Sequence, residues 1–332
     1  MQVIIPMAGM GKRMRPHTLT TPKPLINVGG KSIVQRLVEG ISNVLSEPIE
    51  EIGFIVGDFG KEVESKLLSI AEKIGAKGKM YYQKEALGTA HAILCAAESL
   101  KGKVIVAYAD TLFKADFSLD VSKDGIIWTH KVENPNDFGV VKVDENGNIS
   151  DFFEKPKEFV SDLAIIGIYY FKDGEYLKSE LQFLINNNKK TNGEYGITDA
   201  LYNMMKKGTK FSTSKVEEWF DCGNKNATVY TNQRILELEV NKELIADSSI
   251  IINSTVIKPC FIGEDVKIEN SVVGPHVSVG KNSVINKSIL CNSIIQNNSI
   301  IENMNIENSM VGNFAKLNGK PSKLSLGDYS EI

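Results

Sequence analysis

The 332-residue chain has no apolar run near the roughly 20 residues that a membrane-spanning helix needs. It also shows no secretion signal at its start, because Met1 leads directly into residues that suit a strand. A basic excess is missing too: the formal net charge is −3, whereas a broad nucleic-acid surface is strongly positive. We therefore expect no membrane segment and no nucleic-acid partner.

Cysteine is scarce, and its four copies are scattered at Cys95, Cys222, Cys260 and Cys291. None of them are paired at the spacing of a metal site. Isolated thiols in a chain of this size are typical of a reducing compartment. The sequence therefore predicts a cytoplasmic protein.

The composition is that of an ordinary globular protein, with 42% hydrophobic and 24% charged residues, and the length predicts about two domains. In the first half, apolar stretches of strand length alternate with stretches of helical periodicity. This alternation predicts an α/β domain with a mostly parallel sheet, whose ligands bind beyond the carboxyl ends of the strands. The expected elements are a strand at 3–5, a helix at 32–46, a strand at 52–56, a helix at 61–74, a strand at 80–83, a helix at 89–100 and a strand at 104–108.

The first thirty residues concentrate the signals for phosphate binding. The apolar run 3–5 ends in a turn that contains Ala8, Gly9 and Gly11, and the basic residues Arg13 and Lys23 follow. Backbone N–H groups in such a turn can cradle phosphate oxygens, and a following helix would add its positive end. An Arg fork and a Lys point charge would neutralise phosphate charge.

The complete string resembles the signature of sugar-1-phosphate nucleotidyltransferases, which runs Ala-Gly-x-Gly-x-Arg, then Pro, then Pro-Lys-Pro-Leu. The resemblance implies a Rossmann-like domain and a Mg²⁺-dependent reaction, in which a nucleoside triphosphate and a sugar-1-phosphate give a nucleotide sugar and pyrophosphate. It implies that Arg13 binds the leaving pyrophosphate and that Lys23 stabilises charge between the substrates. Ala8, Gly9 and Gly11 would contact the nucleotide.

A second segment, from Gln83 to Ala90, resembles the family's base-recognition motif, which ends in Leu-Gly-Thr-Ala. The Gln83 amide can donate to and accept from a nucleobase edge at once, Gly88 would let the backbone lie against the base, and Thr89 follows in the motif. The same residues could simply begin a helix with Thr89 as its cap. His91 stands where many members have Gly, and we expect it to be structural rather than catalytic.

Two aspartates resemble the family's metal ligands. Asp110 ends the strand at 104–108, where members commonly have Gly-Asp, and Asp221 lies in a Trp-x-Asp-x-Gly segment. Magnesium prefers few carboxylates together with phosphate oxygens and water. The resemblance therefore implies that Asp110 and Asp221 hold Mg²⁺.

The segment from 125 to 171 reads as strands and resembles the sugar-binding half of the same family. The resemblance implies that Gly139 touches the sugar through its backbone, that Glu154 accepts sugar hydroxyls and that Lys155 faces the sugar phosphate. It also marks Gly167, in a Gly-Ile-Tyr strand, and Glu194, in a Glu-x-x-Ile-Thr-Asp segment, as sugar-phosphate contacts. The Asp199 of that segment is expected to cap a helix.

The substrates stay open at this point. Many members have Asn at the position of Ile165, and the missing amide leaves the sugar undetermined. The base could be thymine, uracil or guanine. The start of the chain and Ile165 favour glucose-1-phosphate with dTTP or UTP.

Beyond Ile245 the composition shifts to Asn, Ser, Ile and Val, and apolar residues recur every six positions, as at 262 and 268 and at 294, 300 and 306. This pattern resembles hexapeptide repeats, which imply a left-handed parallel β-helix. We expect a catalytic domain at 1–243 and a β-helix at 244–332 that forms homo-oligomers and does no chemistry. Acyl transfer is the alternative, with His276 as the candidate residue.

A competing function is a non-catalytic scaffold or regulatory protein that binds a nucleotide sugar. The sequence favours an enzyme, because Arg13, Lys23, Asp110 and Asp221 are all present.

Overall fold

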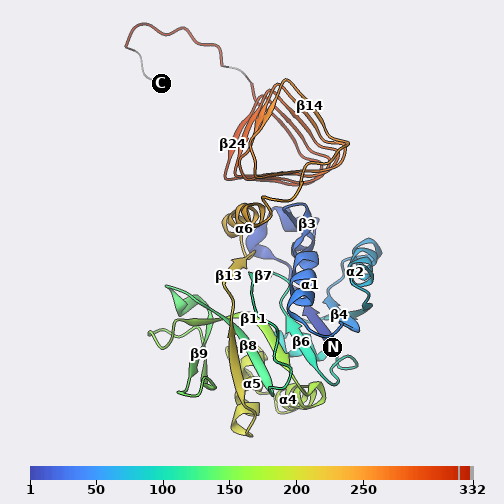
Figure 1. Cartoon of the computed structure of the whole chain (residues 1–332). Coiled ribbons are helices and arrows are strands. Elements are labelled where there is room, and N and C mark those ends of the chain that lie inside the picture. Colours follow the sequence, from blue (N-terminus) through green and yellow to red (C-terminus); the bar gives the residue numbers. More distant parts are fainter. Residues whose placement is uncertain (321, 330–332) are drawn as a thin grey trace. The chain divides into compact units, whose positions relative to one another are not determined.

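The computed structural model describes residues 1–320 and 322–329 (Figure 1). Contacts divide the chain into a first unit of residues 1–26 and 33–222 and a second unit of residues 27–32 and 223–332. The domains expected from the sequence, 1–243 and 244–332, are units that would fold separately. Their boundary therefore remains a prediction. Among the described residues, no helix combines the length and the apolar character needed to cross a membrane.

A mixed nine-stranded sheet forms the centre of the first unit. Its strand order is β10-β9-β11-β6-β1-β4-β5, and β8 and β12 join beside β11. The strands β6, β1, β4 and β5 are parallel, as the alternating pattern predicts, whereas β11 is antiparallel to β6. The strands are β1 (Gln2–Pro6), β4 (Glu51–Val56), β5 (Lys77–Tyr82), β6 (Val104–Ala107), β8 (Gly125–Lys131), β9 (Gly139–Val143), β10 (Ile149–Glu154), β11 (Leu163–Phe171) and β12 (Phe211–Lys215).

Five α-helices accompany this sheet in the described part of the first unit: α1 (Ile33–Val44), α2 (Lys61–Lys73), α3 (Thr89–Leu94), α4 (Gly174–Asn186) and α5 (Ile197–Lys206). Helix α1 buries the apolar stripe that its periodicity predicts, including Leu37 and Ile41. Helix α3 is shorter than the expected 89–100, because the amides of Ala96, Ala97 and Ser99 bond to carbonyls three residues back in tight turns.

The glycine turn after β1 leads into the short 3₁₀-helix η1 (Lys12–Met14) and not into an α-helix. The expected contribution of a helix dipole to phosphate binding at this turn is therefore wrong. Two further 3₁₀-helices follow, η2 (His17–Leu19) and η3 (Lys23–Leu25). A fourth, η4 (Pro135–Asp137), precedes β9.

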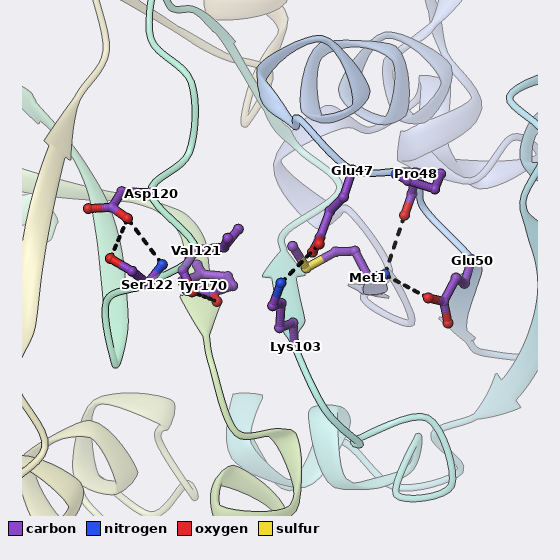
Figure 2. Close-up of polar contacts among 9 residues, drawn as sticks. All are labelled: Met1, Glu47, Pro48, Glu50, Lys103, Asp120, Val121, Ser122 and Tyr170. Atoms are coloured by element: carbon purple, nitrogen blue, oxygen red, sulfur yellow. Dashed lines mark hydrogen bonds and ion pairs between the residues drawn. The ribbon is translucent and has the colours of Figure 1, made fainter.

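Polar contacts anchor the amino ends of β1 and β6 (Figure 2). The Met1 ammonium donates to the Pro48 carbonyl at 3.3 Å and approaches Glu50 at 3.4 Å. Lys103, which precedes β6, donates to Glu47 at 2.9 Å. The carboxyl ends of the same parallel strands lie at the opposite edge of the sheet, where ligands bind in such folds.

The second unit contains helix α6 (Lys225–Leu238), the hairpin β2 (Asn27–Val28) and β3 (Lys31–Ser32), and a left-handed parallel β-helix. Three parallel sheets form the stacked triangular coils seen in Figure 1. The first sheet holds β14 (Ile250–Ile252), β17 (Lys267–Glu269), β20 (Val284–Asn286), β23 (Ile300–Glu302) and β26 (Lys316–Asn318). The second holds β15 (Thr255–Val256), β18 (Val272–Val273), β21 (Ile289–Cys291) and β24 (Asn305–Glu307), and the third holds β16 (Cys260–Ile262), β19 (Val277–Val279), β22 (Ile294–Ile295) and β25 (Met310–Val311).

The coils change length along the β-helix. Asn253 bonds to Asn270, 17 residues further on, whereas Asn282 bonds to Asn298, only 16 residues further on. The apolar core follows this shift and contains Ile295, Ile301 and Ile306. In these shorter coils the apolar residues at 294 and 300 of the six-residue series each lie one position before a core residue, whereas Ile306 is itself in the core.

Candidate functional site

A cavity of about 860 Å³ opens in the first unit, beyond the carboxyl end of β6 and beside β9, β10 and β11. It brings together residues that are far apart in the sequence and were each marked by a different motif. The predicted site residues that line it are Thr89, Asp110, Gly139, Glu154, Lys155, Gly167, Glu194 and Asp221.

Two of the carboxylates that line this cavity belong to neighbouring strands: Asp110 directly precedes one strand and Asp221 ends the other. The strands β7 (Thr111–Lys114) and β13 (Glu218–Asp221) pair antiparallel, with Asp221 opposite Thr111. The N–H of Cys222 donates to the carbonyl of Asp110 at 3.0 Å. Two carboxylates that share a polar cavity with room for phosphate and water form a donor set that fits Mg²⁺.

Lys23 points at the first of these carboxylates. Its Nζ lies 2.7 Å from Oδ2 of Asp110, and its side chain is only 10% exposed. Gly11 shapes the adjacent turn with φ +56°, and a Cβ there would lie 3.1 Å from Cβ of Lys23. The turn therefore needs glycine so that the lysine can pack beneath it.

Open space borders the other predicted residues of the turn. A Cβ at Gly9 would meet no atom within 4 Å. Arg13 is exposed and, like Ala8 and Gly9, does not line the described cavity. Their roles toward a nucleotide remain predictions.

The sugar-side residues form a compact group. A Cβ on Gly139 would lie 3.2 Å from Oε2 of Glu154 and 3.5 Å from Cδ1 of Ile165. The hydroxyl of Thr198 donates to the same Glu154 oxygen at 3.4 Å. Lys155 adopts φ +48° directly after this glutamate. The wall therefore offers an acceptor and a hydroxyl beside an apolar side chain.

Tyr108 and Asp199 also line the cavity, although sequence reasoning gave neither a ligand-binding role. The Tyr108 hydroxyl and Oδ2 of Asp199 are buried and have no hydrogen-bond partner among the described residues. Burial raises the pKa of Tyr108, so its phenol stays neutral and can donate. Its position two residues before Asp110, directly after the strand β6 that leads to the site, was a usable signal.

The expected cap role of Asp199 is wrong. Helix α5 has Gly196 as its N-cap, with no side-chain cap bond. Oδ1 of Asp199 instead accepts from the hydroxyl of Thr191 at 2.9 Å. This bond holds the loop before α5 against the cavity.

The predicted base-recognition segment is held by backbone contacts. Gly88 adopts φ +116°, and a Cβ there would lie 2.5 Å from the carbonyl oxygen of Tyr195. The glycine is therefore required by this protein backbone, whatever it does toward a base. Gly88, not Thr89, is the N-cap of α3, and the Thr89 hydroxyl accepts from the N–H of Ile197 at 3.0 Å. The alternative in which Thr89 caps the helix is thus wrong.

His276 of the second unit makes structural contacts. Its Nε2 lies 3.1 Å from Oε1 of Glu237, and its carbonyl accepts from the amide of Asn232 at 3.3 Å. The buried Asn232 also accepts from the hydroxyl of Ser278 and from the N–H of Gly29. His276 therefore helps to join α6 and the hairpin to the first coils.

Comparison with known proteins gives one family match, to the model described as nucleotidyl transferase, over residues 2–237. A glucose-1-phosphate thymidylyltransferase of Streptomyces antibioticus is 29% identical over 306 residues, which cover 85% of this chain and 83% of that protein. The low-salt glycan biosynthesis nucleotidyltransferase of Haloferax volcanii is 30% identical, with 85% and 84% covered. The bifunctional protein GlmU of Methanococcus maripaludis is 31% identical, and the aligned part covers 78% of this chain and 62% of that protein.

Solved structures share the fold at lower identity. UDP-glucose pyrophosphorylase complexed with UDP-glucose aligns with a TM-score of 0.58 at 24% identity, covering 71% of this chain and 98% of that one. The nucleoside-diphosphate-sugar pyrophosphorylase from Vibrio cholerae aligns with a TM-score of 0.61 at 19% identity, covering 70% and 99%.

Proposed function

The chain belongs to the nucleotidyl transferase family, and we propose that it joins dTTP or UTP to glucose-1-phosphate and releases pyrophosphate. The observation that carries this proposal is that Asp110 and Asp221 line one cavity together with Glu154 and Thr198, while Lys23 contacts Asp110. The two aspartates and the lysine suit phosphates and a metal ion, and the glutamate and the hydroxyl suit sugar hydroxyls. The names of the relatives from Streptomyces antibioticus and Haloferax volcanii support the same class of reaction.

In the proposed reaction a sugar-phosphate oxygen attacks the α-phosphorus in line, a P–O bond forms, and the bond to the leaving pyrophosphate breaks. Such a step depends on positioning and charge neutralisation more than on a covalent nucleophile. Asp110 and Asp221 would hold Mg²⁺, whose positive charge would stabilise the phosphate oxygens.

The protein's own residues would orient the two substrates. Lys23 would place its charge beside the attacked phosphate, and Arg13 would hold the pyrophosphate. Glu154 would accept from sugar hydroxyls, Gly139 would let the sugar approach its backbone, and Lys155 would face the sugar phosphate. Gly167 and Glu194 complete the proposed sugar contacts.

The proposal is tested by measuring pyrophosphate release with each of four nucleoside triphosphates and a panel of sugar-1-phosphates, with Mg²⁺ present. We expect the fastest release with dTTP or UTP and glucose-1-phosphate. No release with any pair would reject it. Tight binding of a nucleotide sugar without turnover at saturating Mg²⁺ would favour the scaffold function instead.

We also propose that the β-helix assembles copies of this chain. Its first strand, β14, carries three exposed isoleucines, Ile250, Ile251 and Ile252, and exposed apolar side chains of this kind favour association. A chain cut after Leu244 keeps every residue that lines the described cavity. We expect light scattering to show a smaller assembly for this shorter chain, with pyrophosphate release retained. An unchanged assembly, or acetyl transfer that depends on His276, would contradict this role.

A further inference from the structure

The amide of Gln83 uses its donor end inside the protein. Its Nε2 lies 3.3 Å from the carbonyl oxygen of Gly88 and 3.2 Å from Nδ1 of His91. A carbonyl oxygen only accepts hydrogen bonds, so the amide nitrogen, and not its oxygen, must face Gly88. Nδ1 then meets the same nitrogen and must accept its second hydrogen. This requirement selects the neutral His91 tautomer that carries its proton on Nε2.

The Gly88 carbonyl is held in place by the backbone around it. The Gly88 carbonyl also accepts from the N–H of Ala92 at 3.0 Å, which fixes it at the start of α3. The Tyr195 N–H donates to the Leu87 carbonyl at 2.9 Å, and the Ala90 N–H donates to the Tyr195 carbonyl at 2.9 Å. The Gln83 amide therefore sits in a rigid frame with one defined orientation.

We propose that His91 is a positioning residue for base selection, because it holds the Gln83 amide with only Oε1 available to a nucleobase. This inference rests on the proposed function and deepens it. From sequence, Gln83 was expected to donate and accept at once, and the geometry leaves it the acceptor role.

An acceptor at this place discriminates between pyrimidines by their ring nitrogen. Uracil and thymine carry an N–H at N3, which can donate to Oε1, whereas cytosine carries an acceptor at N3. With cytosine, the acceptor N3 would face the acceptor Oε1, and neither atom would have a hydrogen-bond partner. Leaving a buried polar group without a partner costs free energy. We therefore expect UTP and dTTP to be preferred over CTP.

The test substitutes His91 and measures kcat and KM for UTP, dTTP and CTP by pyrophosphate release. In His91→Ala the amide loses one of its two acceptors, and the Gly88 carbonyl alone holds its orientation less firmly. We expect KM for the preferred triphosphate to rise about tenfold and the preference over CTP to fall about tenfold, with little change in kcat. His91→Asn is the matched rescue, because its side-chain oxygen can occupy the place of Nδ1, and we expect it to restore the preference.

A double-mutant cycle separates positioning from simple structural damage. In a Gln83→Ala background, His91→Ala should cause no further loss of base preference, because the group that it orients is gone. Equal losses in both backgrounds, or an unchanged base preference in folded His91→Ala, would overturn the proposal. Calorimetric binding of the same triphosphates tests His91 even if no pyrophosphate is released, so a failure of this inference and a failure of the proposed function are distinguishable.

Discussion

The cavity of the first unit and the buried serines of the β-helix coils differ in how their polar side chains are paired. In the cavity, the Tyr108 hydroxyl and one Asp199 oxygen are buried without a partner among the described residues. In the coils, the buried Ser283 hydroxyl donates to the Gln296 carbonyl at 3.0 Å and accepts from the N–H of Ser299 at 3.1 Å. Because an unpaired buried polar group is unfavourable, the two at the cavity are placed to pair with a ligand or with water.

This comparison indicates that the polar side chains of the cavity are placed for a ligand, whereas those of the coils stabilise the β-helix itself. Serines in successive coils bond to backbone groups of the next coil, as Ser271 does with the N–H of Ser288, and Ser288 in turn with the N–H of Met304. Asparagines do the same among themselves, as in the pair Asn292 and Asn308. The polar groups of these ladders serve to stack one coil on the next.

The largest effect should come from the carboxylates of the cavity. Asp110→Asn and Asp221→Asn should each lower turnover by about two orders of magnitude or more, because a lost metal ligand removes several kcal/mol of charge stabilisation in the transition state. The exposed Asp116→Asn is the control and should be nearly neutral. Near-normal Mg²⁺-dependent turnover in a folded Asp110 or Asp221 variant would reject the role of that residue.

Lys23→Ala should have the next largest effect and should lower kcat by about tenfold or more while changing KM less. Its charge lies 2.7 Å from Asp110 and should matter most when the phosphorus is attacked. Steady-state kinetics with each substrate varied in turn measures the split, and exposed Lys12→Ala serves as the matched control. A change in KM alone would show that Lys23 only holds ground-state phosphate.

In the coils, Ser283→Val should destabilise the β-helix by about 1–3 kcal/mol, because it leaves the Gln296 carbonyl and the Ser299 N–H unpaired. Hydrogen exchange of the coil amides measures this local loss. Pyrophosphate release should be unchanged, since Ser283 belongs to the second unit. A large fall in pyrophosphate release in folded Ser283→Val would contradict this division of roles between the two units.

The smallest effect concerns Tyr170, a buried tyrosine that, unlike Tyr108, has a partner (Figure 2). Its hydroxyl donates to the Val121 carbonyl at 2.8 Å. Burial, followed by the negative charges of Glu47 and Asp120, raises its pKa from 10.0 to about 12.

The unfolded chain loses the Tyr170 proton near pH 10, whereas the folded chain keeps it until about pH 12. The stability that the neutral phenol contributes is therefore complete below pH 10 and is lost as the pH rises through this window. Tyr170→Phe should flatten the fall in stability between these pH values in chemical unfolding curves. An identical slope in both proteins would contradict the expected shift.

The parts of the site that are close in sequence were predictable because local chemistry determines them. A strand that ends in a carboxylate and a turn with two glycines each indicated a residue at the carboxyl ends of the parallel strands. A Trp-x-Asp-x-Gly segment indicated Asp221, which the pairing of β13 with β7 then places near Asp110. The convergence of Asp110 with Lys23, 87 residues apart, depends on how the strands pair. No local pattern records that distance.

The sequence by itself determined the family, the alternating α/β pattern and the repeats of the β-helix, because periodicity and short motifs depend on residues close together in the chain. Only the tertiary structure decided that the Gly88 backbone lies against Tyr195, that the caps of α3 and α5 are glycines, and that the Gln83 amide faces His91. These features arise where separate segments meet, and there packing and hydrogen bonding between distant residues override local preference.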